Sequence, residues 1–141
     1  MLLTVESLRA MGYFCSDEHI IDFAVGYPEQ GMSLDDLLNH EIPPEHKVWI
    51  AIRVLPSPMV AAFAVQCMLR FLRAVERHGY KVHPVCWLVA DLTAAASREG
   101  TEDAEEAAII VHFATQAAFA EGDHYIQVAD LRRLVAETAV A

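Results

Sequence analysis

The chain is poor in the residues that build disulfide-bonded or irregular small domains. Of its 141 residues, three are cysteines, and glycine and proline number six each. The cysteines are odd in number and far apart, at Cys15, Cys67 and Cys86, which excludes a disulfide framework. Cys67 and Cys86 lie in apolar helical pattern, so we interpret them as buried free thiols and expect a reducing, cytoplasmic compartment.

Long apolar segments are also missing. The two most apolar runs, 58–69 and 107–120, have 12 and 14 residues, whereas a helix that spans a bilayer needs about 20. No basic segment leads into an apolar core with a small-residue cleavage site, so no secretion signal is predicted. We therefore expect core helices and no contact with a membrane.

Strand patterns are absent, and helix signals recur in their place. No six-residue window combines strict alternation with flanking turn residues. Helix starts are predicted at Thr4, Ser16, Ser33, Pro44, Pro58, Pro84 and Thr101, and stops at Gly12, Gly26, Gly79, Gly100 and Gly122. The sequence predicts an all-α, single-domain bundle over residues 1–141 with about eight helices. A subregion of short acidic helices at 1–45 is expected to pack on a core of longer helices at 46–141.

Two of the longer segments indicate where the core lies. In segment 58–78 the apolar residues recur on one face, and the opposite stripe holds Gln66, Arg70, Arg73 and Arg77. Segment 102–120 is apolar nearly all round beyond its first turn, with Phe113 near its middle. Such a segment is typical of a helix at the centre of a bundle.

Charge is distributed unevenly along the chain. Twenty Asp and Glu face ten Lys and Arg, which gives a net charge of −10. Residues 1–45 carry −8, residues 46–98 carry +5, and residues 99–141 carry −7. Because nucleic-acid binding calls for a dominant positive field, we expect no direct nucleic-acid partner. We interpret the arginine stripe as pairing with acids of neighbouring helices or as solvated surface.

The acids are densest between residues 16 and 36, which hold six carboxylates and no Lys or Arg. They belong to Asp17, Glu18, Asp22, Glu29, Asp35 and Asp36. The buried side of this stretch is assigned to Ile20, Ile21, Phe23 and Val25, which leaves the carboxylates in solvent. We predict that these six acids form a partner-binding face, because carboxylates complement clusters of Lys and Arg.

Two chemical alternatives use the same stretch. Glu18 and Asp22 have the spacing of a pair of metal ligands on one helix face, but no second motif completes a metal site. Cys15 and His19 have the spacing of a thiol and its base, yet the acids beside them work against a thiolate. No cofactor fingerprint occurs elsewhere, so we predict a protein that is not an enzyme, with no catalytic residue, cofactor or metal.

Six residues in the first third of the chain occur in an order that matches a known sequence pattern. They are Cys15, Phe23, Tyr27, Pro28, Gly31 and Trp49, with a brief helix before them and a short acidic helix among them. This order resembles a short N-terminal module found in bacteriophage and prophage proteins of unknown function. Residues 41–48 depart from that module, which has an acidic and aromatic run there. The resemblance implies a mobile element in a bacterial host cell and no catalytic residues.

Two classes of function fit these observations. The favoured one is a non-enzymatic binding protein, encoded by a phage or mobile element, whose partner is a basic host protein or nucleoprotein complex. It would inhibit a host nucleic-acid-handling complex, in the manner of an anti-CRISPR protein, through its acidic helical surface. The alternative is a small helical enzyme or metal-binding bundle that uses the acidic stretch. A homodimer formed through an exposed apolar face stays an open possibility.

The central place assigned to segment 102–120 generates a prediction. Phe113→Asp is expected to lower the free energy of unfolding by several kcal/mol, because it buries a charge that has no partner. Urea denaturation of the purified variant measures this loss. A soluble Phe113→Asp protein with unchanged stability would show that the segment is not central.

Overall fold

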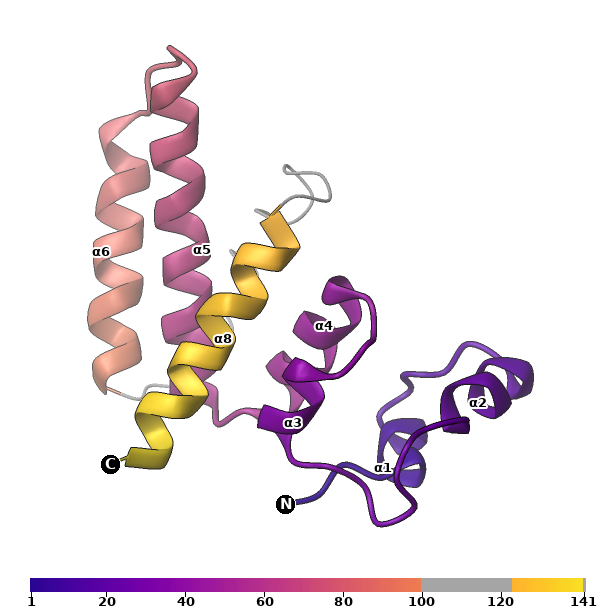
Figure 1. Ribbon diagram of the computed structural model, residues 1–141. Helices are drawn as coiled ribbons and strands as arrows, with labels where there is room; N and C mark the ends of the chain where they lie inside the picture. Colours follow the sequence, from indigo (N-terminus) through magenta and orange to yellow (C-terminus); the bar gives the residue numbers. More distant parts are fainter. Residues whose placement is uncertain (100–122, 141) are drawn as a thin grey trace. The chain divides into compact units, whose positions relative to one another are not determined.

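The computed structural model describes residues 1–99 and 123–140 (Figure 1). Every regular element in this part of the chain is an α-helix, and its only β-type pairing is an isolated bridge between Leu3 and Met32. The predicted all-α class is therefore confirmed. The predicted helix at 102–120, its Phe113 and the stop signals at Gly100 and Gly122 lie outside the described residues.

Seven helices occur in the described ranges. They are α1 (Val5–Ala10), α2 (Asp17–Ala24), α3 (Leu34–Asn39), α4 (Pro44–Val54), α5 (Ser57–Arg77), α6 (Pro84–Glu99) and α8 (Asp123–Val140). They divide between two compact units, and α8 contributes residues to both. Unit 1 comprises Met1–Val54 and Leu131–Ala141, and unit 2 comprises Leu55–Asp130. A single domain over residues 1–141 stays a prediction.

The three short N-terminal helices begin at the predicted capping residues. The Oγ1 atom of Thr4 accepts a hydrogen bond from the Ser7 amide at 3.0 Å. Ser16 and Ser33 likewise accept from the amides three residues further along, each at 3.1 Å. An isolated helix of six or eight residues is unstable in water, and a cap contributes about 1 kcal/mol. Capping therefore helps to define these helices, but packing must hold them.

The packing of unit 1 centres on the bridge between Leu3 and Met32. The two residues exchange backbone hydrogen bonds of 2.8 and 3.1 Å, and the Tyr27 hydroxyl donates to the Leu3 carbonyl at 2.5 Å. The buried apolar cluster around this bridge consists of Leu3, Leu8, Tyr27, Met32, Leu37 and Ile50. Segments from both ends of the first 50 residues thus share one core.

Two cations of unit 1 converge on the carbonyl oxygen of Leu38, near the C-terminal end of α3. Lys47 Nζ donates to it at 2.9 Å, and Arg132 donates from Nη2 at 2.6 Å and from Nε at 3.2 Å. Burial lowers the pKa of Lys47, and the nearby Arg132 charge lowers it further. Carbonyls at a helix C-terminus lack intrahelical partners and favour cations, so this contact stabilises the end of α3.

Unit 2 contains a helical hairpin in which α6 packs along α5 (Figure 1). The predicted apolar face of α5 is confirmed, with Val60, Phe63, Ala64, Cys67 and Leu72 all buried. Gly79, at a φ of +86°, ends α5 at one of the predicted stop signals. By length and composition α5 is able to cross a membrane, but half of that segment is buried in the structure, and core helices meet the same criterion.

The close approach at the Leu3–Met32 bridge generates a prediction for Gly31. This residue has a φ of +80°, and a Cβ atom there would lie 2.6 Å from the Leu3 carbonyl oxygen. Gly31→Ala is expected to lower the free energy of unfolding by roughly 2–4 kcal/mol, through backbone strain and displacement of the bridge. Urea denaturation checks this value.

Gly12 offers a matched control for that variant. It has nearly the same φ, +79°, but no atom lies within 4 Å of the position of its Cβ. Gly12→Ala is expected to cost only roughly 1 kcal/mol, the strain of a left-handed backbone alone. Equal losses for the two variants would show that the contact with Leu3 does not hold unit 1 together.

Candidate functional site

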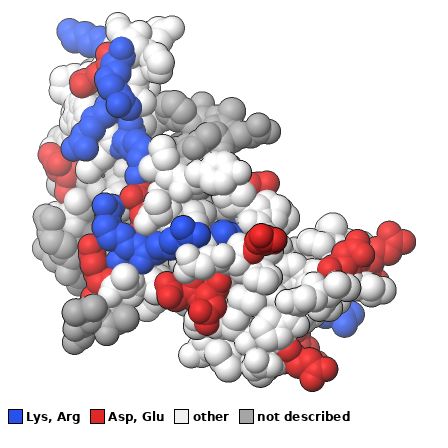
Figure 2. Space-filling model, in the orientation of Figure 1, with Lys and Arg blue, Asp and Glu red and all other residues white. Residues whose placement is uncertain are grey.

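The six acids predicted to bind a partner are all exposed in unit 1. Three lie on α2, two lie on α3 and one lies in the turn between them; together Asp17, Glu18, Asp22, Glu29, Asp35 and Asp36 are called the acidic face. Figure 2 shows acidic side chains over this part of the molecule. Within the described ranges, no Lys or Arg forms an ion pair with any of them. Of the six, only Asp36 has a side-chain hydrogen bond within the described residues: its Oδ2 accepts from the Ser33 hydroxyl at 2.7 Å.

The apolar residues of α2 do not all face inward, and the prediction for two of them is wrong. Ile21 and Val25 are 66% and 80% exposed. The inward stripe holds His19, Ile20 and Phe23, and even these are only partly buried. A helix that packs on one side buries residues three and four apart, so Ile21 and Val25 fall on the outer side with the carboxylates. The outer side of α2 is therefore both acidic and apolar.

Behind α2 lies a cluster of aromatic and imidazole rings. Tyr13 is at its centre, with edge-to-face or tilted contacts to the rings of Phe14, Phe23 and Trp49. The Tyr13 hydroxyl also forms a 2.8 Å hydrogen bond with His46 Nδ1. Burial, and secondly the charge of Glu45, raises the pKa of Tyr13 to about 12. The cluster fixes the inward side of α2 and so determines which side of the helix faces solvent.

Cys15 and His19 do meet, as their spacing predicts. The Cys15 sulfur lies 3.6 Å from His19 Nδ1, and the Cys15 amide donates to the same nitrogen at 3.5 Å. The imidazole thus satisfies a backbone group just ahead of α2, which is a capping role. Within residues 1–99 and 123–140, no three His, Cys, Asp or Glu side chains lie close enough together to hold a metal ion.

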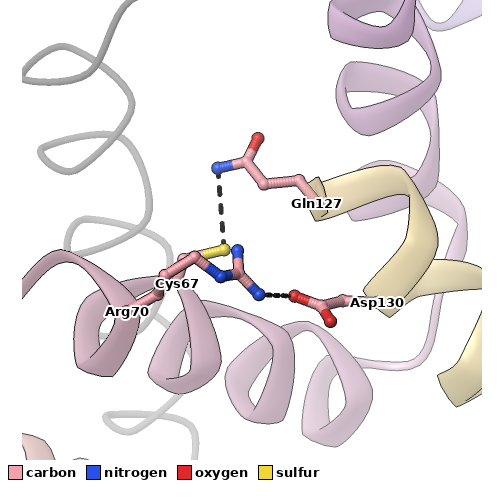
Figure 3. Close-up of polar contacts among 4 residues, drawn as sticks. All are labelled: Cys67, Arg70, Gln127 and Asp130. Carbon is pink, nitrogen blue, oxygen red and sulfur yellow. Dashed lines mark hydrogen bonds and ion pairs between the residues drawn. The ribbon is translucent and has the colours of Figure 1, made fainter. Parts of the chain in front are cut away.

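A buried polar cluster in unit 2 joins α5 to α8 (Figure 3). The Arg70 guanidinium forms an ion pair with Asp130, and Gln127 Nε2 lies 3.6 Å from the sulfur of Cys67. Cys67, Gln127 and Asp130 are buried, and Arg70 is partly buried. Gln127 and Asp130 were not predicted from the sequence. The one signal is their spacing: they lie three residues apart on α8, as Cys67 and Arg70 do on α5. A buried polar cluster of this kind specifies how two helices pack.

The arginines of the stripe on α5 differ in their surroundings. Arg70 pairs with an acid of a neighbouring helix, whereas Arg73 and Arg77 are exposed. Figure 2 shows Lys and Arg gathered at the end of the hairpin where α5 leads to α6. The stripe is thus one structural arginine followed by solvated cations.

Comparison with protein-family models, with curated proteins and with solved structures gives no match for this chain. The likeness of its first third to a phage module stays a prediction.

The ion pair in unit 2 generates a prediction for Asp130. Asp130→Ala leaves the partly buried Arg70 without this carboxylate, so we expect a loss of about 2–3 kcal/mol in unfolding free energy. Asp91→Ala serves as a control, because Asp91 is exposed on α6. Similar melting temperatures for the two variants in differential scanning calorimetry would contradict a structural role for the pair.

The raised pKa of Tyr13 predicts a pH dependence of stability. Its stabilising contribution is fully present below pH 10.0, the ordinary value, and is lost as the pH rises towards about 12. Tyr13→Phe is therefore expected to flatten the fall in melting temperature over this interval. Tyr80→Phe, which alters an exposed tyrosine, is expected to follow the wild type. A Tyr13→Phe protein with the wild-type slope would contradict the assignment.

Proposed function

We propose that this chain is a non-enzymatic binding protein whose acidic face engages a basic host protein or nucleoprotein complex. The observation that carries the proposal is the exposure of six carboxylates that pair with no Lys or Arg of the described chain. Acids that contribute to a protein's own stability form ion pairs with its Lys and Arg. These carboxylates have no such pairs and repel one another. A basic partner removes that repulsion.

The chemistry of the face favours an inhibitor of a nucleic-acid-handling complex. Carboxylates and phosphates suit the same Lys and Arg clusters, so an acidic helical surface can occupy a groove built for nucleic acid. The face itself takes no nucleic acid, because like charges repel. With the phage-like order of residues in the first third, this leads to the sharpest form of the proposal: an inhibitor of the anti-CRISPR kind, encoded by a mobile element and acting in the bacterial cytoplasm.

The second candidate is a small helical enzyme or metal-binding bundle that uses the same stretch. The contact between Cys15 and His19 is the observation in its favour, since a thiol and an imidazole are both ligands of soft metals. Metal analysis of the purified protein, followed by Zn²⁺ titration of wild type and Cys15→Ser, separates the two candidates. Stoichiometric zinc that is lost in Cys15→Ser would replace the binding proposal.

The acidic face can be tested by removing its charge. In the variant, Asp17, Glu18, Asp22, Asp35 and Asp36 are changed to Asn or Gln. We expect an unchanged or slightly higher melting temperature, because exposed like charges are removed. We also expect at least a tenfold weaker retention of basic nucleoproteins from a bacterial lysate, with a flatter dependence on salt.

A matched variant separates this face from net charge. Glu6, Glu41, Glu45, Glu76 and Glu137 are exposed and lie outside the acidic face, and their change to Gln removes the same charge. The two proteins are used as parallel baits, and any retained complex is then purified and titrated with each. Equal binding by both variants would leave the acidic face as solubilising surface and would make Arg73 and Arg77 the better contact residues.

A further inference from the structure

The strongest remaining feature is an apolar stripe on α6 that no described element covers. Val85, Leu88 and Leu92 are 50%, 55% and 61% exposed. They follow the spacing i, i+3, i+7 and so form one face, while Trp87 and Ala90 on other sides of the helix are partly or fully buried. Large apolar residues that recur along one exposed face of a helix are characteristic of a surface on which another helix packs.

Cations border this stripe at its N-terminal end. Arg77, at the end of α5, and Lys81, in the turn before α6, are both exposed, with Glu76 as the one acid beside them. The N-terminus of a helix adds a partial positive charge of its own. A helix that docks here must therefore offer carboxylates at one end and apolar side chains farther along.

The outer side of α2 has this composition. Glu18 is exposed near its N-terminal end, and the exposed apolar residues Ile21 and Val25, the C-cap residue, follow it; the exposed Asp22 lies between them in the sequence. The stretch from Asp17 to Val25 is about 12 Å long and the stretch from Val85 to Leu92 about 10 Å, at 1.5 Å per residue. In a parallel alignment, Glu18 meets the cations ahead of α6, Ile21 and Val25 meet the N-terminal part of the apolar stripe, and Asp22 lies beside them.

We infer that the α6 stripe and its basic border bind α2 of a second copy of this chain. The two faces are complementary in charge and in apolar exposure. The inference does not rest on the proposed function, but it uses part of the acidic face, so self-association and partner binding compete. Two short helix faces bury less than the roughly 1,200 Å² of stable complexes, so we expect a reversible association with a dissociation constant on the order of 10⁻⁴ M.

Charge reversal on each face, followed by mixing, tests the inference. The first variant carries Glu18→Lys and Asp22→Lys, and the second carries Arg77→Glu and Lys81→Glu. Sedimentation velocity at several hundred micromolar protein and physiological salt should show self-association for the wild type. Each variant alone should be weakened by about tenfold or more, because like charges then face each other. An equimolar mixture of the two should regain association, because each altered face then finds its complement on the other molecule.

Two controls make the result specific. Glu29→Lys with Glu41→Lys changes the net charge as the first variant does but lies outside α2, and it should associate like the wild type. Leu88→Ser with Leu92→Ser should abolish association without loss of helical circular dichroism, since both residues are exposed. A monomeric wild type, or a mixture that stays monomeric, would overturn the inference. Neither result bears on a basic partner, which the neutralised variant tests separately.

Discussion

The reciprocal backbone hydrogen bonds between Leu3 and Met32 are the constraint on which unit 1 depends. They bring together two segments separated by α1 and α2, and the Tyr27 hydroxyl donates a further hydrogen bond to the Leu3 carbonyl. Gly31 permits the approach, because any side chain there would meet the Leu3 backbone. Helices as short as α1, α2 and α3 do not persist alone, so this closure and the core around it present the acidic face in a defined form.

Buried and exposed charged groups differ in whether they have partners. Where the described chain buries a charged group, the group has a partner: Lys47 donates to the Leu38 carbonyl, and Asp130 pairs with Arg70. The carboxylates of α2 and α3 are exposed and have no such partners among the described cations. Buried pairs specify packing, and exposed unpaired charges of one sign create a field that steers a partner of the opposite sign. Under the proposed function, the chain uses acids for both purposes, in different places.

The sequence predicted what is local and missed what depends on distant contacts. The caps at Thr4, Ser16 and Ser33 were predictable, because each side chain bonds an amide only three residues away. The Leu3–Met32 bridge has no such signature, since each side of the bridge is a single residue. Gln127 and Asp130 are polar residues that a hydropathy pattern assigns to solvent, and only their match to Cys67 and Arg70 on α5 explains their burial.

The wrong prediction for Ile21 and Val25 has the same origin, because distant contacts decide which side of α2 is buried. Five apolar residues lie within positions 20–25, so spacing alone does not decide which stripe is buried. The ring cluster around Tyr13 decides it in favour of His19, Ile20 and Phe23. The six acids were placed in solvent by the sequence and are exposed in the structure, but the apolar side chains between them were not foreseen. The proposed partner of this face must therefore offer apolar contacts as well as cations.

Amide hydrogen exchange, measured on the free protein and on its complex with the captured host partner, tests the central claim most directly. If the acidic face is the contact surface, the partner should slow exchange in peptides from residues 16–36, which contain α2, the turn after it and α3. Exchange in peptides from residues 70–83, at the basic end of the hairpin, should stay unchanged. Slowed exchange confined to residues 70–83, with none in residues 16–36, would contradict the account.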